Sequence, residues 1–188
     1  MQLRPRYPVR TERLLLRPLT AADTAGLLAY RSREDVCRWV PFSPMTAAEI
    51  ADRLATVWSG TELVDEGQSL TLGVELAGSG ELLGDVVLFW HSREHSGGEI
   101  GYVLNPEFGG KGYATEAVRG VLQLGFDELG LHRIIARIDA RNEASARLAS
   151  RLGMRQEAHL LRNERFKGDW SDELDFAMLV DEWRIQRD

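Results

Sequence analysis

The stretch Asn105-Pro106-Glu107-Phe108-Gly109-Gly110-Lys111-Gly112-Tyr113-Ala114-Thr115-Glu116-Ala117 joins an apolar segment to an amphipathic one through three glycines in four positions. Residues 100–104 before it predict a buried strand that ends at Asn-Pro, and residues 117–129 after it keep apolar side chains at helical spacing. Glycine lets backbone N–H groups approach a ligand closely, and a helix N-terminus adds unpaired donors with a partial positive charge. The stretch therefore predicts a strand, an anion-binding turn for a phosphate or pyrophosphate, and a helix.

The turn differs from two common nucleotide loops. A P-loop has Ser or Thr after its lysine, whereas Lys111 is followed by Gly112. A dinucleotide fingerprint has a third glycine where this chain has Thr115. The residues alone leave two alternatives open, which are a different phosphate site and a tight strand-to-helix connection without a ligand.

The turn resembles the acetyl-CoA pyrophosphate loop of the GCN5-related N-acetyltransferase (GNAT) superfamily. Its pattern is Arg or Gln, two residues, Gly, one residue, then Gly or Ala, and Gly112 and Ala114 fit it. Gly109 stands at the leading Arg or Gln position, so one side chain is missing and the backbone is left to bind the phosphates. The resemblance implies that the cofactor contacts the loop at Gly109, Gly110, Lys111, Gly112, Tyr113, Ala114 and Thr115.

A second segment, Asn142 to Met154, follows an apolar strand at 133–139. It predicts a helix that Asn142 caps, with Leu148 and Leu152 packed inward and Gly153 at its end. It also resembles the family's second cofactor motif. The resemblance implies that Asn142 lies at the cofactor, and that the backbone of Tyr102 and Leu104 pairs with its pantetheine arm. It also places positive charge near the CoA phosphates, from Lys111, Arg119, Arg147 and Arg151, and a solvated helix face is the alternative for each.

Two further segments are similar to the RimJ/RimL-like branch of the family. They are Thr11 to Leu19 near the start, and the pair formed by Leu161-Arg162-Asn163 and Lys167 to Glu173 near the end. The resemblance spans about Val9 to Trp183, and it implies an α/β fold: a mixed, mostly antiparallel sheet of about seven strands, splayed at the cofactor, with about four helices.

The element pattern agrees with that fold. We expect strands at 14–18, 69–76, 82–90, 99–104, 133–139, 155–166 and 173–181, and helices at 21–31, 46–59, 115–129 and 143–152. Thr46 and Glu49 predict a capping box. With 188 residues and no repeat or low-complexity linker, we expect residues 1–188 to form a single N-acetyltransferase domain.

Composition limits the environment and the partners. The single Cys37 cannot form an internal disulfide, and no apolar run is long enough for a signal or a membrane span, so we expect a cytoplasmic protein. The 29 acidic and 23 basic residues give a net charge of −6, which disfavours nucleic acid and anionic membranes as partners. Monomer and homodimer both remain open.

Acetyl transfer to an amine needs a base and an acid for the departing thiolate, but no metal. Glu99, which begins the strand before the loop, is the candidate base, and an apolar setting could raise its pKa. An exposed charge at the strand start is the alternative. Ser145 is the candidate acid, since no tyrosine follows Tyr113.

His91 and His95 lie four residues apart in a surface-type loop, where we expect no metal.

The resemblance implies an acceptor pocket between the first two helices, the turn after the third strand and the closing hairpin. The residues that it assigns to this pocket are Trp39, Phe42, Trp90, Arg162 and Asn163, with His91 nearby. The sequence therefore predicts an acetyl-CoA-dependent N-acetyltransferase that acts on a primary amine, either a protein N-terminus or a small molecule. The alternative is a noncatalytic acyl-CoA-binding module.

Overall fold

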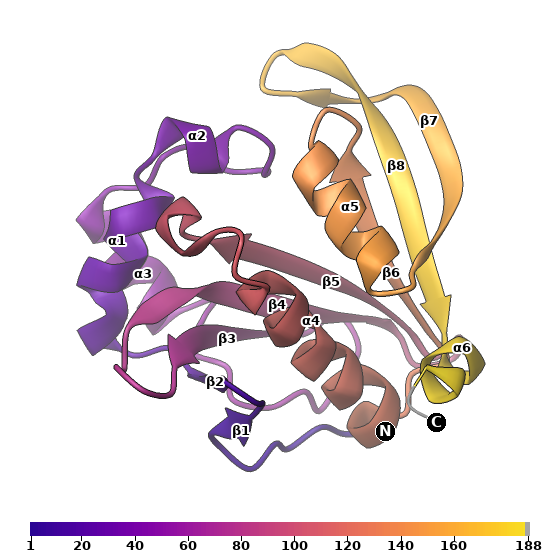
Figure 1. Ribbon diagram of the computed structural model, residues 1–188, viewed down its shortest axis with the longest axis horizontal. Helices are drawn as coiled ribbons and strands as arrows, with labels where there is room; N and C mark the ends of the chain where they lie inside the picture. Colours follow the sequence, from indigo (N-terminus) through magenta and orange to yellow (C-terminus); the bar gives the residue numbers. More distant parts are fainter. Residues whose placement is uncertain (187–188) are drawn as a thin grey trace.

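The computed structural model describes residues 1–186, and all of its named strands belong to one eight-stranded sheet (Figure 1). The spatial order is β1-β2-β3-β4-β5-β6-β8-β7. Only β5 and β6 run parallel, so the sheet is mixed and mostly antiparallel, as predicted. The sequence predicted about seven strands, and the additional one is the two-residue β1.

The strands follow the predicted segments closely. Their bounds are β1 Val9–Arg10, β2 Leu14–Pro18, β3 Ser69–Leu76, β4 Leu82–Ser92, β5 Gly97–Leu104, β6 Arg133–Asp139, β7 Arg155–Phe166 and β8 Asp169–Leu179. The two strands next to the predicted site, β4 and β5, are each two residues longer than expected where they meet at their connecting turn. This extension changes which side chains of β4 face the site.

Six α-helices lie within residues 1–186: α1 Thr24–Arg31, α2 Glu34–Cys37, α3 Ala47–Ala55, α4 Tyr113–Gln123, α5 Glu143–Arg151 and α6 Val180–Ile185. The sequence predicted about four, and the two short helices α2 and α6 were missed. The predicted caps are confirmed, since Thr46 Oγ1 accepts from the Glu49 N–H and Asn142 Oδ1 accepts from the Ser145 N–H. Gly153 ends α5 with φ +84°.

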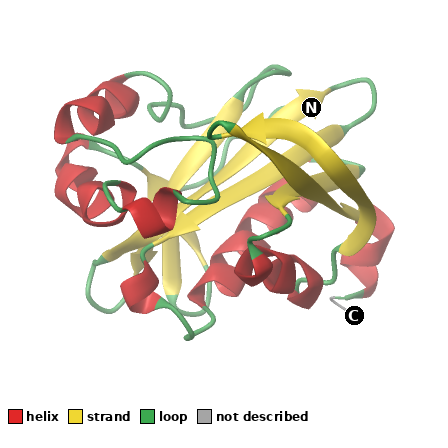
Figure 2. Cartoon of the chain, turned by 90° about the horizontal axis from the view of Figure 1, so that it is seen from above, coloured by secondary structure: helices red, strands yellow, loops and turns green. Residues whose placement is uncertain are grey.

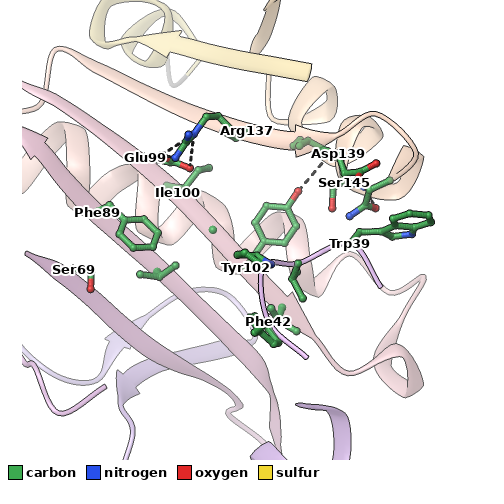
Figure 3. Close-up of a pocket in the computed structure, with 18 of the residues that line it drawn as sticks. Trp39, Phe42, Ser69, Phe89, Glu99, Ile100, Tyr102, Arg137, Asp139 and Ser145 are labelled. Atoms are coloured by element: carbon green, nitrogen blue, oxygen red, sulfur yellow. Dashed lines mark hydrogen bonds and ion pairs between the residues drawn. The ribbon is translucent and has the colours of Figure 1, made fainter. Parts of the chain in front are cut away.

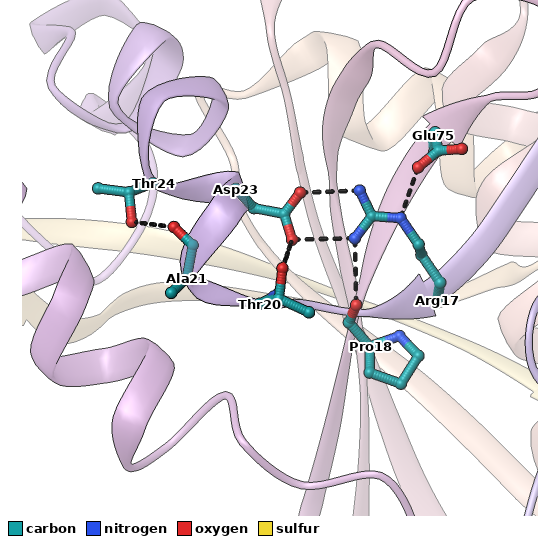
Figure 4. Close-up of polar contacts among 7 residues, drawn as sticks. All are labelled: Arg17, Pro18, Thr20, Ala21, Asp23, Thr24 and Glu75. Carbon is teal, nitrogen blue, oxygen red and sulfur yellow. Dashed lines mark hydrogen bonds and ion pairs between the residues drawn. The ribbon is translucent and has the colours of Figure 1, made fainter.

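Two apolar clusters lie on opposite sides of the sheet, and Figure 2 shows helices on both sides. The larger cluster packs α4 and α5 against the sheet, and the smaller one packs α1 and α3. The turn from β2 into α1 is held by Arg17, which donates two hydrogen bonds to Asp23 (2.9 and 2.7 Å) and one to Glu75 (2.5 Å) (Figure 4). Burial opposes ionisation of Asp23, but Arg17 outweighs it and lowers the pKa of that carboxyl.

The sheet opens between β5 and β6. These strands pair only at Gly97, Gly98 and Glu99, while the other edge of β5 stays paired with β4 as far as Leu104. From Ile100 onward, β5 has no partner strand on the β6 side. The predicted splay is therefore present, and Glu99 is the last paired residue before the gap.

Candidate functional site

Two cavities lie along this gap. The central cavity has a volume of about 500 Å³ and is lined by Tyr102 of β5 and Ser145 of α5, among others. The loop cavity has a volume of about 700 Å³ and is lined by Leu104 of β5, the glycine turn and Arg151 of α5. Because β5 and α5 contribute to both, the two cavities are neighbours along one gap.

The glycine turn has the geometry that anion binding requires. Gly110 and Gly112 have φ values of +75° and +81°, which side chains rarely adopt, and an added Cβ on Gly110 would meet no atom within 4 Å. Gly112 precedes the first residue of α4, so the unpaired N–H groups of that helix face the turn. A backbone cradle open to solvent at a helix N-terminus fits a pyrophosphate.

Most of the predicted cofactor residues line these two cavities. Those in the loop cavity are Leu104, Gly109, Gly110, Gly112, Tyr113, Ala114 and Thr115, and those in the central cavity are Tyr102 and Asn142. Lys111 is not in either lining, and its ammonium lies 5.9 Å from the centre of the Phe108 ring.

The position of Arg147 does not support the cofactor contact predicted for it. Its side chain is 66% exposed, donates to Glu143 one turn earlier (2.9 Å) and lines neither cavity. Arg151, one turn later on α5, lines the loop cavity instead, together with Arg119 and Arg13. The helical period explains the correction, since Arg147 lies on the solvent face with Glu143.

Glu99 has the position expected of a base. Its side chain is 13% exposed and lines the central cavity, and Figure 3 shows its carboxylate paired with Arg137, whose Nη2 lies 3.0 Å away. Nε2 of His91 lies 2.8 Å from the same carboxylate. The alternative interpretation of Glu99, an exposed charge at the start of the strand, does not fit a side chain that is only 13% exposed. The ion pair fixes the carboxylate at the point where the gap opens.

A tyrosine hydroxyl also reaches the gap. Tyr102 donates from its Oη to the carbonyl oxygen of Ser145 (3.3 Å), and Figure 3 shows its ring between the Glu99–Arg137 pair and Ser145. Burial raises the pKa of Tyr102 above its ordinary value, although neighbouring Ser145 and Arg151 act in the opposite direction. The sequence indicated only a backbone contact with the cofactor for Tyr102, so this hydroxyl was missed. Strand alternation alone could not have found it, because alternation places Tyr102 on the face of β5 opposite to Glu99 and Val103.

The predicted acceptor residues divide into two groups. Trp39 and Phe42 line the central cavity, as does His91. Trp90 does not: it is fully buried in the larger core cluster, so its assignment to the pocket is wrong. Because β4 continues to Ser92, its side chains alternate through this region, and Phe89 and His91 line the cavity in place of Trp90.

Arg162 and Asn163 also lie outside the lining of the central cavity. They occupy an irregular part of the β7–β8 pairing, where Arg162 has φ +50°. Asn163 Nδ2 donates to Oε1 of Glu173 (3.0 Å), so it contacts the cavity through that carboxylate. The hairpin residues that line the cavity directly are Glu164, Phe166, Ser171, Asp172 and Glu173.

The charge of the central cavity is unevenly compensated. Arg31 pairs with Asp85, and Arg137 and His91 pair with Glu99. Glu173 is 7% exposed, and its carboxylate accepts a hydrogen bond from the Asn163 amide. Burial raises the pKa of Glu173, and the charges of Asp175 and Glu164 act in the same direction. This end of the cavity therefore favours a positively charged ligand group.

Within residues 1–186, no group of three or more His, Cys, Asp or Glu side chains is placed to hold a metal ion. No helix in that part of the chain has both the length and the apolar character that a membrane span requires.

Comparison with known proteins agrees with this geometry. Residues 13–155 match the family described as acetyltransferase (GNAT) domain. The chain is 32% identical over 175 residues to the uncharacterized N-acetyltransferase YnaD of Bacillus subtilis (strain 168), covering 93% of this chain and 98% of that protein.

Two solved structures are also similar. An acetyltransferase of the GNAT family from Bacillus anthracis is 30% identical, with a TM-score of 0.82 and coverage of 96% of this chain and 99% of that one. A spermidine N-acetyltransferase from Vibrio cholerae, in complex with CoA and spermine, has a TM-score of 0.77 over 93% of this chain and 99% of that one, and at 21% identity it shows the shared fold. The chain thus belongs to the GNAT family and is an N-acetyltransferase, in a family whose acetyl donor is acetyl-CoA.

Proposed function

We propose that this protein transfers the acetyl group of acetyl-CoA directly to a primary amine bound in the central cavity. The observation that carries the proposal is the place of Glu99, which is the last residue of β5 paired to β6 and lines the cavity where the strands separate. A donor held by the glycine turn would reach this point along the open edge of β5.

Acetyl-CoA supplies an activated thioester, and residues of the chain would handle the protons. Glu99 accepts a proton from the ammonium group of the acceptor, directly or through a water molecule, and the neutral amine that results attacks the thioester carbonyl. The new C–N bond forms and the C–S bond breaks, the departing thiolate takes a proton from the Tyr102 hydroxyl, and Tyr102 regains a proton from the nitrogen of the new amide. Ser145 lines the same cavity, so its hydroxyl is the alternative donor. No covalent bond to the protein is needed.

The cavity also indicates the kind of acceptor. Its volume of about 500 Å³ is in the range typical of small-molecule sites. Trp39, Phe42 and Phe89 give it aromatic walls beside the gap, so the acceptor would carry an apolar group next to its primary amine. A small amine and the first residue of a protein N-terminus both meet this description.

The test is release of free thiol from acetyl-CoA in the presence of an amine panel. The panel contains aromatic and alkyl monoamines, diamines, dipeptides with free N-termini and a highly polar aminoglycoside. We expect thiol release above background with at least one apolar-bodied amine or N-terminus, and mass spectrometry should show one added acetyl group on that amine. A noncatalytic acyl-CoA-binding module would release no thiol with any amine, and that outcome would overturn the proposal.

A further inference from the structure

Arg13, in the segment that enters β2, contacts the glycine turn although it lies about a hundred residues earlier in the chain. Its Nη1 donates to the Lys111 carbonyl (3.0 Å), and its guanidinium lies 4.6 Å from the centre of the Tyr113 ring. Its Nη2 is 3.5 Å from where a Cβ on Gly112 would be. Arg13 lines the loop cavity together with the turn itself.

The turn lacks a cationic side chain of its own in this cavity. Gly109 occupies the position where the family pattern has Arg or Gln, although its φ of −63° is open to any residue. The ammonium of Lys111 lies near Phe108, and Lys111 is absent from the cavity lining. A long basic side chain that arrives from elsewhere in the chain would replace what the turn omits.

Glu116 in the first turn of α4 makes such a cation more important. Its side chain is 14% exposed and accepts from the Thr11 hydroxyl (2.5 Å), the Arg13 backbone N–H (2.7 Å) and Arg13 Nε (2.7 Å). An uncompensated carboxylate here would repel a phosphate at the helix N-terminus. Arg13 Nε compensates it, while Nη2 donates to no acceptor among residues 1–186.

We propose that Arg13 supplies the cationic side chain that Gly109 omits from the turn, and that its Nη2 group binds the pyrophosphate of acetyl-CoA. The inference rests on acetyl-CoA as the donor, and it concerns binding rather than turnover. A guanidinium fixed by Glu116 and by the Lys111 carbonyl is already oriented, so little side-chain freedom is lost when the phosphate binds.

Calorimetry with CoA tests this on the full chain. Arg13→Gln should weaken CoA binding by about tenfold or more, since a charge-assisted hydrogen bond is lost. Arg10→Gln is the matched control, because Arg10 is exposed, lies three residues earlier and lines neither cavity. Absence of CoA binding to the wild-type protein would refute the proposal that acetyl-CoA is the acetyl donor. CoA binding that Arg13→Gln leaves unchanged would refute only the role of Arg13.

Glu116→Gln separates a direct contact from a structural one. It removes the ion pair but keeps the Arg13 charge, so we expect CoA binding that is equal or tighter, and the double variant Arg13→Gln/Glu116→Gln should stay as weak as Arg13→Gln. If Arg13 only anchors the N-terminal segment, Glu116→Gln weakens binding as much as Arg13→Gln. If Arg13 only neutralises Glu116, the double variant recovers wild-type affinity. Either result overturns the proposal.

A second ligand identifies the phosphate group. 3′-Dephospho-CoA keeps the pyrophosphate and lacks the phosphate on the ribose. The loss caused by Arg13→Gln should be the same for 3′-dephospho-CoA as for CoA. A loss that disappears with 3′-dephospho-CoA would assign Arg13 to the ribose phosphate and overturn the pyrophosphate contact. Thermal unfolding of each variant, followed by circular dichroism, checks that the fold is retained.

Discussion

The two cavities share β5 and α5 but differ in charge and in what lines them. The loop cavity is lined by glycines, a helix N-terminus and arginines that include Arg13, Arg119 and Arg151. The central cavity is lined by aromatic side chains and by more carboxylates than nearby cations compensate. One gap therefore offers an anion site at one end and a site for a cationic or amine group at the other. This polarity suits the transfer of an acetyl group from a phosphate-bearing donor to an amine.

The two cavities also differ in the groups that we expect to bind the donor and the acceptor. In the loop cavity we expect the backbone of the turn and the Arg13 side chain to bind the donor, so the substitutions that matter are those that block the turn or remove this guanidinium. In the central cavity we expect side chains to contact the acceptor, so single polar replacements should be enough to change catalysis or acceptor affinity. Substitution of Gly112 tests the loop cavity, and substitutions of Glu99, Tyr102, Trp39 and Glu173 test the central cavity.

Glu99→Gln should have the largest effect. The amide keeps the shape of the side chain but cannot accept the amine proton, so turnover should fall by on the order of 10²-fold near pH 7, while CoA affinity in calorimetry stays unchanged. Raising the pH should restore part of the rate, because more of the amine is then already deprotonated. Glu94→Gln, on the exposed turn between β4 and β5, is the control and should behave as wild type.

A Glu99→Gln enzyme with wild-type turnover at every pH would show that water or the acceptor supplies this function. Equal losses of turnover and CoA affinity would instead make Glu99 a structural residue of the gap.

Gly112→Val should weaken CoA binding by at least about tenfold, which corresponds to about 1.4 kcal/mol. Its φ of +81° is unfavourable for valine, and the added side chain would stand between the turn and the phosphates, beside Arg13. Gly80→Val is a matched control, since Gly80 has φ +76°, has free space around it and lines neither cavity. The control should lose stability without losing CoA affinity. Equal affinities for both variants would remove the turn from the cofactor site.

The glycine turn and Glu99 show which parts of the site could be predicted from the sequence. The glycine turn is contiguous, so its residues and their order specify its conformation without knowledge of distant contacts. The caps at Thr46 and Asn142 and the ends of most elements are local in the same sense. Glu99 could be proposed because the strand that contains it leads directly into the turn.

The central cavity is different because its wall is assembled from segments far apart in the chain. Glu173 faces it because β8 pairs with β6 at Asp139, a register that no local pattern specifies. Trp90 was misassigned because the end of β4 lay two residues beyond the predicted one, and a strand exposes alternate residues to each face. Arg13 was missed because its contact with the turn depends on how β2 packs beside α4.

Tyr102→Phe should lower turnover by about tenfold with acetyl-CoA affinity nearly unchanged, since only a proton donor is lost. Because the pKa of Tyr102 is raised above 10.0, the hydroxyl stays protonated near neutral pH, and its ionisation should limit the rate only in strongly basic solution. Ser145→Ala is the informative partner variant, because it keeps the carbonyl that Tyr102 contacts and removes only the hydroxyl. A larger loss for Ser145→Ala than for Tyr102→Phe would make Ser145 the proton donor.

The smallest expected effect concerns the two kinds of contact that the acceptor makes. Trp39→Ala removes aromatic surface from the central cavity, so the acceptor KM should rise several-fold for every apolar amine, with little change in CoA affinity. Glu173→Gln removes only charge, so it should raise KM about threefold to tenfold for a diamine and leave KM for a monoamine of similar size nearly unchanged. Ionised Glu173 is the form that attracts a cation, and its raised pKa means that this discrimination should weaken as the pH falls. Steady-state kinetics with a matched pair, one alkyl monoamine and the diamine of the same length, separates the two effects.

If Glu173→Gln changes KM equally for both amines, the carboxylate orders the hairpin rather than contacting a second ammonium group. If Trp39→Ala has normal acceptor kinetics, the aromatic wall belongs to the packing of α2 and the acceptor binds nearer the β7–β8 hairpin.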